Sequence, residues 1–146
     1  LDIRKTLLLA LALILLLACA TRGEQLRLAA YEGDSETTSE LIAKGVDLEE
    51  RNEFGNTALM LAAMEGHAKT AEVLIAGGAE VNARNRGEST ALMLAVKKGN
   101  IETVKVLRRA GAEVNAKTPG GLTPLKIAEA TGNREIIDLL KQAGAE

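Results

Sequence analysis

The chain has 146 residues, of which 47% are apolar, and a formal net charge of −2, a composition that favours a folded domain. Tyr31 and Phe54 are the only aromatic residues, which requires an aliphatic core and argues against the base stacking used by single-stranded nucleic-acid binders. One cysteine and one histidine exclude an intramolecular disulfide and the four-ligand set of a structural zinc site. We therefore expect no nucleic-acid partner and no metal.

Residues 1–18 have the pattern of a secretory signal peptide. Arg4 and Lys5 form a short positive end, and residues 7–20 are an unbroken apolar run of 14 residues. This run is shorter than the ~20 residues that a membrane-spanning helix needs. Cleavage after Ala20, at the small-residue pattern ACA of residues 18–20, would release a secreted protein, and a retained membrane anchor is a further alternative.

The sequence LLAC at residues 16–19 resembles the lipobox of bacterial lipoproteins. The resemblance implies that Cys19 is lipidated and becomes the mature N-terminus, with residues 19–25 forming a short tether to the folded domain. It also implies the bacterial cell envelope, and Ala20 in place of an aspartate implies the periplasmic face of the outer membrane. A soluble periplasmic or secreted protein is the alternative localisation.

The rest of the chain repeats itself every 33 residues. The segments NTALMLAAMEGH, STALMLAVKKGN and LTPLKIAEATGN begin at residues 56, 89 and 122, and they align without insertion. One step earlier, residues 26–45 carry leucine, alanine and glycine in the same frame. We therefore predict four units, at about residues 19–51, 52–84, 85–117 and 118–146, of which the outer two are atypical.

Each unit has the pattern of two helices followed by a loop. Thr57, and the threonine at its position in the other segments, precedes a helical pattern that its hydroxyl can cap, and Gly66 can end that helix in a left-handed conformation. A second apolar stripe follows and ends at Gly78, after which residues rich in asparagine and glycine turn the chain back. The second stripes contribute three predicted core residues, Leu74, Leu107 and Leu140.

The positions of threonine, leucine, alanine and glycine resemble those of the ankyrin repeat over residues 25–146. The resemblance implies an all-α fold, an ankyrin-repeat solenoid of four stacked helix-turn-helix repeats joined by hairpin-like loops, over residues 26–146. Glu88 occupies the place of a turn glycine, with Gly87 one place early, which predicts a differently shaped hairpin tip. Glu49 replaces the asparagine that Asn82 and Asn115 retain from this pattern.

The sequence does not assemble a catalytic site. A single histidine gives no nucleophile, histidine and acid set, and the glycine pairs fit turns rather than a phosphate-binding loop. Asp34, Asn100 and Asn133 have the same repeat position as His67. Polar residues of these types at one position predict that each caps the start of the second helix in its own repeat. We therefore expect a non-enzymatic protein without catalytic residues, cofactor or metal ligands.

Charge is distributed unevenly along the chain. Residues 24–80 contain 12 acidic and 4 basic side chains, whereas residues 81–141 contain 11 basic and 6 acidic ones. The cations include a predicted cluster of five: Lys97, Lys98, Lys105, Arg108 and Arg109. The uneven charge is either a pair of solvated surfaces or a dipole that orients a partner. The cluster is either a solvated helix surface or a contact with an anionic lipid or an acidic partner.

The ankyrin resemblance implies a monomeric protein–protein interaction module that binds an unidentified protein through its concave face. That face consists of the hairpin tips and the exposed sides of the first helices, where the variable positions correspond to Arg51, Glu53, Phe54, Asn56, Met64, Glu65, Arg84, Arg86, Ser89, Lys97, Lys98, Lys117 and Leu122. Phe54 either is an exposed binding anchor or folds back over the neighbouring loop. An immunity-type protein that neutralises a toxin by binding, and a structural or stress-support component of the envelope, are alternative functions.

Overall fold

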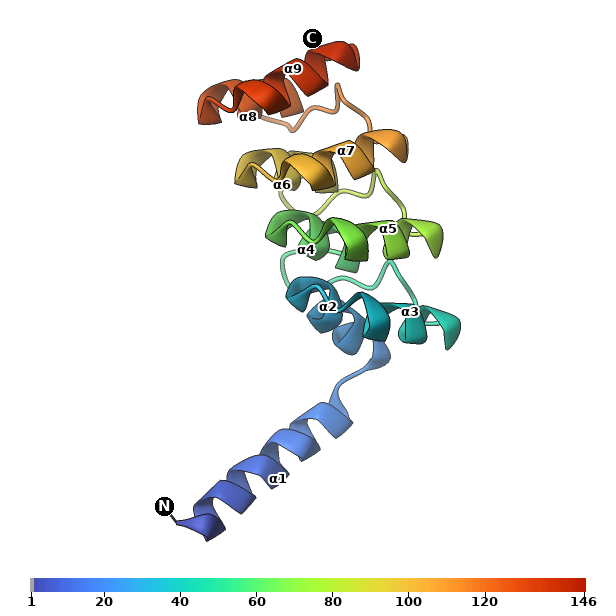
Figure 1. Ribbon diagram of the computed structural model, residues 1–146, viewed down its shortest axis with the longest axis vertical. Coiled ribbons are helices and arrows are strands. Elements are labelled where there is room, and N and C mark those ends of the chain that lie inside the picture. The colour runs from blue at the N-terminus through green and yellow to red at the C-terminus, as the bar shows by residue number, and fades with distance from the viewer. Residues whose placement is uncertain (1) are drawn as a thin grey trace.

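The structure is a computed structural model that describes residues 2–146, apart from the side chains of residues 12–19. Within that range the chain forms nine α-helices and no strand (Figure 1). The helices are α1 (Ile3–Cys19), α2 (Arg22–Glu32), α3 (Ser35–Ala43), α4 (Ala58–Glu65), α5 (Ala68–Ala76), α6 (Ala91–Lys98), α7 (Ile101–Arg109), α8 (Pro124–Thr131) and α9 (Arg134–Gln142).

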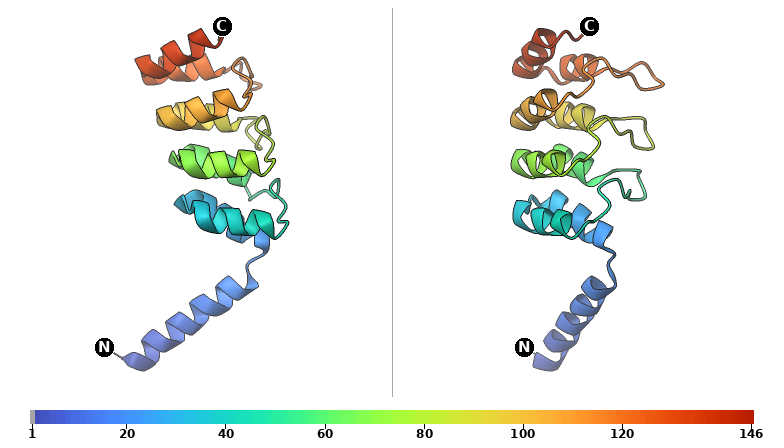
Figure 2. Two further views of the ribbon diagram at one scale, coloured as in Figure 1. Left: turned by 45° about the vertical axis from the view of Figure 1, so that its right-hand side comes forward. Right: turned by 90° about the vertical axis from the view of Figure 1, so that its right-hand side faces the viewer.

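The helices from α2 to α9 stack as two layers. The first helices of the four units, α2, α4, α6 and α8, each contact the equivalent helix of the adjacent unit, and the second helices, α3, α5, α7 and α9, do the same. The loops between units project away from the helical layers on one side (Figure 2). This arrangement confirms the predicted all-α solenoid of four stacked helix pairs.

The ends of each first helix follow from the repeated threonine and glycine. The Thr57 hydroxyl accepts a hydrogen bond from the backbone N–H three residues on, at 3.4 Å, and Thr90 and Thr123 cap α6 and α8 in the same way. Gly66 ends α4 with a left-handed φ of 82°, and its N–H donates to the Ala62 carbonyl oxygen. The predicted start and end of these helices are confirmed.

Leucines and alanines form the core between the two layers. Leu74, Leu107 and Leu140, from the last three second helices, are fully buried, as predicted. Ala62 and Ala95 of the first helices are also fully buried, and side chains this small let neighbouring helices approach closely. Each unit therefore buries apolar surface between its own two helices and also against the neighbouring units.

The hairpin tip at Glu88 keeps the shape of the other two tips, so the prediction of a different shape is wrong. Glu88 has a left-handed φ of 58°, close to 77° at Gly55 and 74° at Gly121, its equivalents in the adjacent units. Its N–H also donates to the Asn85 carbonyl oxygen, the same turn hydrogen bond that closes the other tips. Glutamate ordinarily has a negative φ, so the repeated turn imposes backbone strain at this residue.

The backbone hydrogen bond between the first two hairpin tips is not repeated between the second and third tips. At Gly55 an added Cβ would lie 2.7 Å from the backbone nitrogen of Arg86, which donates to the Phe54 carbonyl oxygen. The residue equivalent to Arg86 in the last hairpin is Pro119, which has no N–H to donate. The second and third tips therefore lack this hydrogen bond, so it does not restrict the side chain of Glu88.

We expect Glu88→Gly to stabilise the protein. Glycine relieves the left-handed strain of ~1–2 kcal/mol but makes the unfolded chain more flexible, which leaves a net gain of about 0.5–1 kcal/mol. The exposed ion pair with Arg84, at 3.8 Å, contributes little and its loss is a small correction. Urea unfolding followed by circular dichroism measures the gain, with Glu88→Ala as the control that removes the carboxylate and keeps the strain. Equal stability of the glycine and alanine variants would contradict the strain argument.

The first helical pair begins directly after α1. Residues 22–25, assigned above to a tether, form the first turn of α2, where Thr21 and Glu24 cap the helix reciprocally. Glu50 holds this end in place, because its carboxylate accepts hydrogen bonds from Thr21 and from Arg27, each at 3.2 Å. Among the described residues, no helix is long and apolar enough to cross a membrane. The side chain of Cys19, the predicted lipidation site, lies outside the described part of the chain.

Candidate partner-binding surface

The 33-residue period places one row of aliphatic residues across the four first helices. Leu28, Leu61, Leu94 and Ile127 occupy the same position of α2, α4, α6 and α8. We call the surface made by this row, the exposed first-helix residues beside it and the three hairpin tips (residues 52–56, 85–89 and 118–122) the concave face. Two apolar hollows lie on it, one between units one and two and the other between units three and four.

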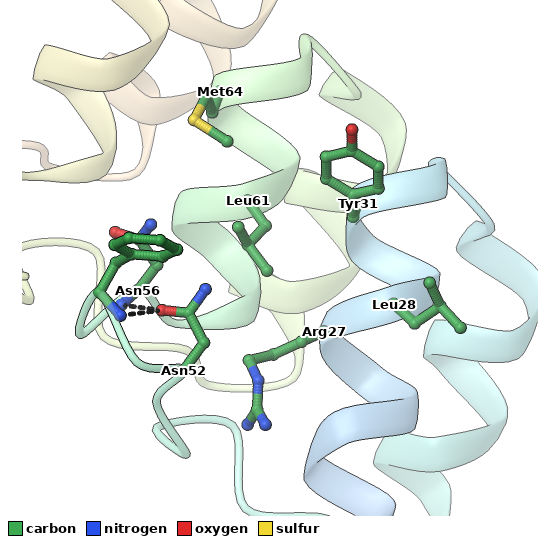
Figure 3. Close-up of a pocket in the computed structure, with 8 residues that line it drawn as sticks. Arg27, Leu28, Tyr31, Asn52, Asn56, Leu61 and Met64 are labelled. Carbon is green, nitrogen blue, oxygen red and sulfur yellow. Dashed lines mark hydrogen bonds between the residues drawn. The ribbon is translucent and has the colours of Figure 1, made fainter. Parts of the chain in front are cut away.

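The proximal hollow lies between α2, α4 and the first hairpin tip and has a volume of about 430 Å³. Its apolar lining consists of Leu28, Tyr31, Phe54, Leu61 and Met64. Figure 3 shows Tyr31 on α2 and Met64 on α4 at one end of this hollow, with Leu61 between the two helices. Aliphatic and aromatic side chains on three separate elements therefore converge on one open site.

The distal hollow lies between α6, α8 and the last hairpin tip and has a volume of about 320 Å³. Leu94, Leu122 and Ile127 contribute to its apolar lining, and Lys97 and Lys126 line it as well. Both hollows are at the low end of the size of small-molecule sites, and both are open to solvent. Sites of this size suit single side chains of a larger partner better than a buried small ligand.

The exposed large apolar residues of the repeat region gather on this one face. Among residues 21–146 they are Leu28, Tyr31, Phe54 and Leu122, with exposed fractions of 46%, 49%, 63% and 50%. All four line one of the two hollows. The exposure of Phe54 favours the alternative of an open side chain over one that folds back. Exposed apolar patches are a common feature of interaction sites, which makes this face the candidate binding surface.

The comparison with known protein families agrees with this architecture. The family model described as ankyrin repeats (3 copies) matches residues 26–118. The chain belongs to the ankyrin-repeat family. Ankyrin repeats are protein–protein interaction modules and are generally non-catalytic. Residues 119–146, which form nearly all of the fourth repeat, lie outside the matched range, and α8 and α9 pack on the third repeat as a further helix pair. A comparison with curated proteins found no match.

Three of the residues predicted to bind a partner hold neighbouring ankyrin hairpins together. The Arg51 guanidinium donates to the carbonyl oxygens of Gly55 and of Arg84, and Arg84 donates in turn to the Lys117 carbonyl oxygen at 2.8 Å. Asn56 is 8% exposed and accepts a hydrogen bond from Asn85 at 2.8 Å. Part of the hydrogen-bonding capacity of these side chains is therefore used within the solenoid.

Nine of the other ten predicted residues lie on the first helices or hairpin tips of repeats two to four, and Lys117 directly precedes the last tip. Eight of them are exposed: Glu53, Phe54, Glu65, Arg86, Lys97, Lys98, Lys117 and Leu122. Met64 and Ser89 are half-buried beside the hollows. The sequence prediction missed Leu28 and Tyr31, although they lie 33 residues before Leu61 and Met64 and therefore have the equivalent positions in the first repeat.

The five cations predicted as one cluster are divided between two sides of the solenoid. Lys97 and Lys98 are exposed at the end of α6, whereas the other three project from α7. The turn at Gly99 sends the two helices into different layers, so the single cluster expected from the sequence is not formed. Only the first two cations belong to the concave face.

Two of the three α7 cations, Lys105 and Arg109, face acidic residues of the second-helix layer. Lys105 Nζ lies 2.8 Å from Glu102 Oε1 and 3.6 Å from Glu135 Oε1, and Arg109 lies 3.5 Å from Glu72. The hydrogen bond to Glu102 raises the pKa of Lys105 above its ordinary value. Such exposed pairs contribute little stability, but they neutralise charge on this side of the solenoid.

His67 and Asn100 link repeats instead of capping their own helices, so the predicted cap is wrong for these two. His67 Nε2 lies 2.9 Å from the Tyr31 carbonyl oxygen, and because a carbonyl only accepts, the ring donates from this nitrogen. Asn100 Nδ2 donates to the carbonyl oxygens of Ala63 and Met64, both at 2.9 Å. The unsatisfied carbonyls at the end of the preceding first helix attract these donors.

Asp34 and Asn133 do cap their own helices, as predicted. Asp34 Oδ1 accepts from the Thr37 N–H at 2.9 Å and Asn133 Oδ1 from the Ile136 N–H at 3.2 Å. The hydrogen bond from the Thr37 hydroxyl is the largest of the causes that lower the pKa of Asp34. Among the described residues, no group of three His, Cys, Asp or Glu side chains is placed to hold a metal ion.

Proposed function

We propose that the protein is a non-catalytic binding module anchored in the bacterial cell envelope, where it binds one protein partner through its concave face. The observation that carries the proposal is the position of the exposed apolar side chains. Leu28, Tyr31, Phe54 and Leu122 are all on that face and line its hollows. Aromatic side chains such as Tyr31 and Phe54 are enriched at protein interfaces, and the exposed leucines add apolar surface beside them.

The anchor in this proposal is a lipid on Cys19, with the solenoid on the periplasmic face of the outer membrane. The lipobox-like sequence at residues 16–19 supports it, and so does the start of the folded domain. Because α2 begins at Arg22 and Thr21 caps it, the connection to Cys19 spans only ~7–10 Å. An anchored solenoid would hold the concave face close to the membrane surface.

We expect Cys19→Ser to abolish labelling of the protein by a fatty-acid probe in bacterial cells. The variant should also move from the membrane fraction to the soluble or unprocessed fraction, because serine cannot form the thioether. The matched control is Cys19→Ser combined with Ser39→Cys, which keeps one cysteine at an exposed position of α3 and should stay unlabelled. A mature wild-type N-terminus at Thr21 by protein sequencing would rule out the lipid anchor.

Photo-crosslinking in the native envelope tests the binding face. A photoreactive amino acid at Phe54 or at Leu122 should give the same crosslinked partner, since both positions belong to one face. The same amino acid at Lys69 or Lys141, exposed on the second helices α5 and α9, is the control and should give none. Partner crosslinks from the second helices alone would place the interface on the opposite side.

A further inference from the structure

The two hollows of the concave face set a spacing for the side chains that could fill them. The proximal hollow lies between repeats one and two, and the distal hollow lies between repeats three and four. Neighbouring packed helices are separated by ~8–10 Å, so two repeats of offset place the hollows ~16–20 Å apart. Leu61 lines the proximal hollow and Leu94 lines the distal one. We call the strip of the concave face that runs from one hollow to the other, with these two leucines as its floor, the groove.

The backbone along this floor offers little to an extended peptide. The first helices use their N–H and carbonyl groups internally, and the tip N–H groups of Phe54 and Asn56 donate to the Asn52 side chain. Ser89 and Leu122 donate in the same way, to Asn85 and Thr118. An extended segment on this face would leave its backbone without partners, whereas a helix satisfies its own backbone and presents side chains to the groove.

The two ends of the groove carry opposite charges that are not neutralised locally. Lys97, Lys98 and Lys126 lie at the distal end, and within residues 2–146 none of them is in an ion pair. Lys126 Nζ donates only to a backbone carbonyl, at 3.0 Å. Glu32 and Glu65 are exposed on the proximal first helices and are likewise outside ion pairs in the described residues. Lys105 and Arg109 of α7, by contrast, face acidic partners.

We infer that the partner presents an amphipathic helix along the concave face, with one apolar anchor in each hollow and acidic residues at the end that lies over α6 and α8. This inference rests on the proposed concave-face function. At a rise of 1.5 Å per residue, ~16–20 Å corresponds to ~11–13 residues. A spacing of ~11 residues brings both anchors back to one side of the helix, because three turns contain about 10.8 residues.

Fluorescence anisotropy with a designed helical peptide tests this inference. The probe carries leucine anchors eleven residues apart and three glutamates around the second anchor. The full chain is held in phosphatidylcholine nanodiscs, and empty nanodiscs give the blank. We expect binding that becomes about tenfold weaker when serine replaces the second anchor. Exchange of the glutamates for lysines should weaken it at least as much, with a larger effect at low salt.

Variants of the protein test which end of the probe binds at which end of the groove. Leu122→Ser should weaken binding of the probe about tenfold and leave the peptide without the second anchor unaffected. Lys97→Glu with Lys98→Glu should reverse the preference, so that the lysine peptide binds better than the glutamate peptide. Lys69→Glu makes a charge reversal on α5, away from the groove, and should change neither affinity.

Three results would overturn the inference. The first is that the acidic probe does not bind. The second is that the acidic and lysine peptides bind equally, and the third is that Leu122→Ser leaves the affinity unchanged. Equal or tighter binding of the same sequence with prolines that prevent a helix would also contradict the helical occupant. If partner crosslinks still come from Phe54 and Leu122, such results reject this partner chemistry alone. Crosslinks from the second helices would reject the proposed binding face itself.

Discussion

Leu107→Ala is expected to lower the free energy of unfolding by about 2–5 kcal/mol, the range for removing a leucine from a packed core. Leu107 is fully buried on α7, which contacts α5 in one neighbouring repeat and α9 in the other. Helices on both sides limit how far the structure can collapse into the cavity, which favours the upper part of the range. The loss is measured by urea unfolding followed by circular dichroism.

Leu140→Ala is the matched control for this substitution. Leu140 is equally buried and has the equivalent position in repeat four, but among the described residues α9 contacts a second helix, α7, on one side only. The terminal repeat can therefore relax or unfold locally, and the loss of global stability should be smaller. An unchanged unfolding curve for Leu107→Ala, or a larger effect at Leu140, would contradict the proposed dependence of each repeat on its neighbours.

Gly55→Ala is expected to destabilise the protein by about 2–4 kcal/mol, from two separate causes. The left-handed φ of 77° disfavours any side chain by ~1–2 kcal/mol. The new Cβ would also lie 2.7 Å from the backbone nitrogen of Arg86, so the link between the first two hairpin tips must shift. Thermal unfolding of the full chain reports the combined effect.

Gly121→Ala separates the two causes, because Gly121 has a similar φ of 74° and no atom within 4 Å of an added Cβ. It should lose only the conformational part, ~1–2 kcal/mol. Equal losses at the two glycines would show that the contact between the hairpin tips adds nothing. The position beside Phe54 also links this test to the binding face, since a shifted tip would change the shape of the proximal hollow.

The fold was predictable from the sequence because its signals are local and recur at one interval. Thr57 and Gly66 mark the ends of a helix by their own chemistry, and the period then fixes which faces meet. Contacts between repeats were not predictable in the same way. His67 was expected to cap its own helix, but the carbonyl oxygen of Tyr31, 36 residues away, attracts its donor instead.

The candidate site was predictable in its position and less so in its residues. The variable positions indicated the concave face. The sequence gives no sign that Arg51 and Arg84 donate hydrogen bonds to the backbone of neighbouring hairpins. Glu49 shows a similar limit. One oxygen accepts from the Glu80 N–H at 2.8 Å, as Asn82 does one repeat on, while its other oxygen is buried without a partner in the described structure. Such pairings depend on three-dimensional proximity, which a motif does not encode.

The most direct test of the account is the affinity of the crosslinked partner for a triple variant, Phe54→Ala with Lys97→Glu and Lys98→Glu. The three side chains are exposed on the concave face, so the fold should remain intact by circular dichroism. We expect affinity to fall at least about tenfold, because an apolar anchor is lost and two charges are reversed. Unchanged affinity in a folded triple variant would show that the partner binds elsewhere on the solenoid.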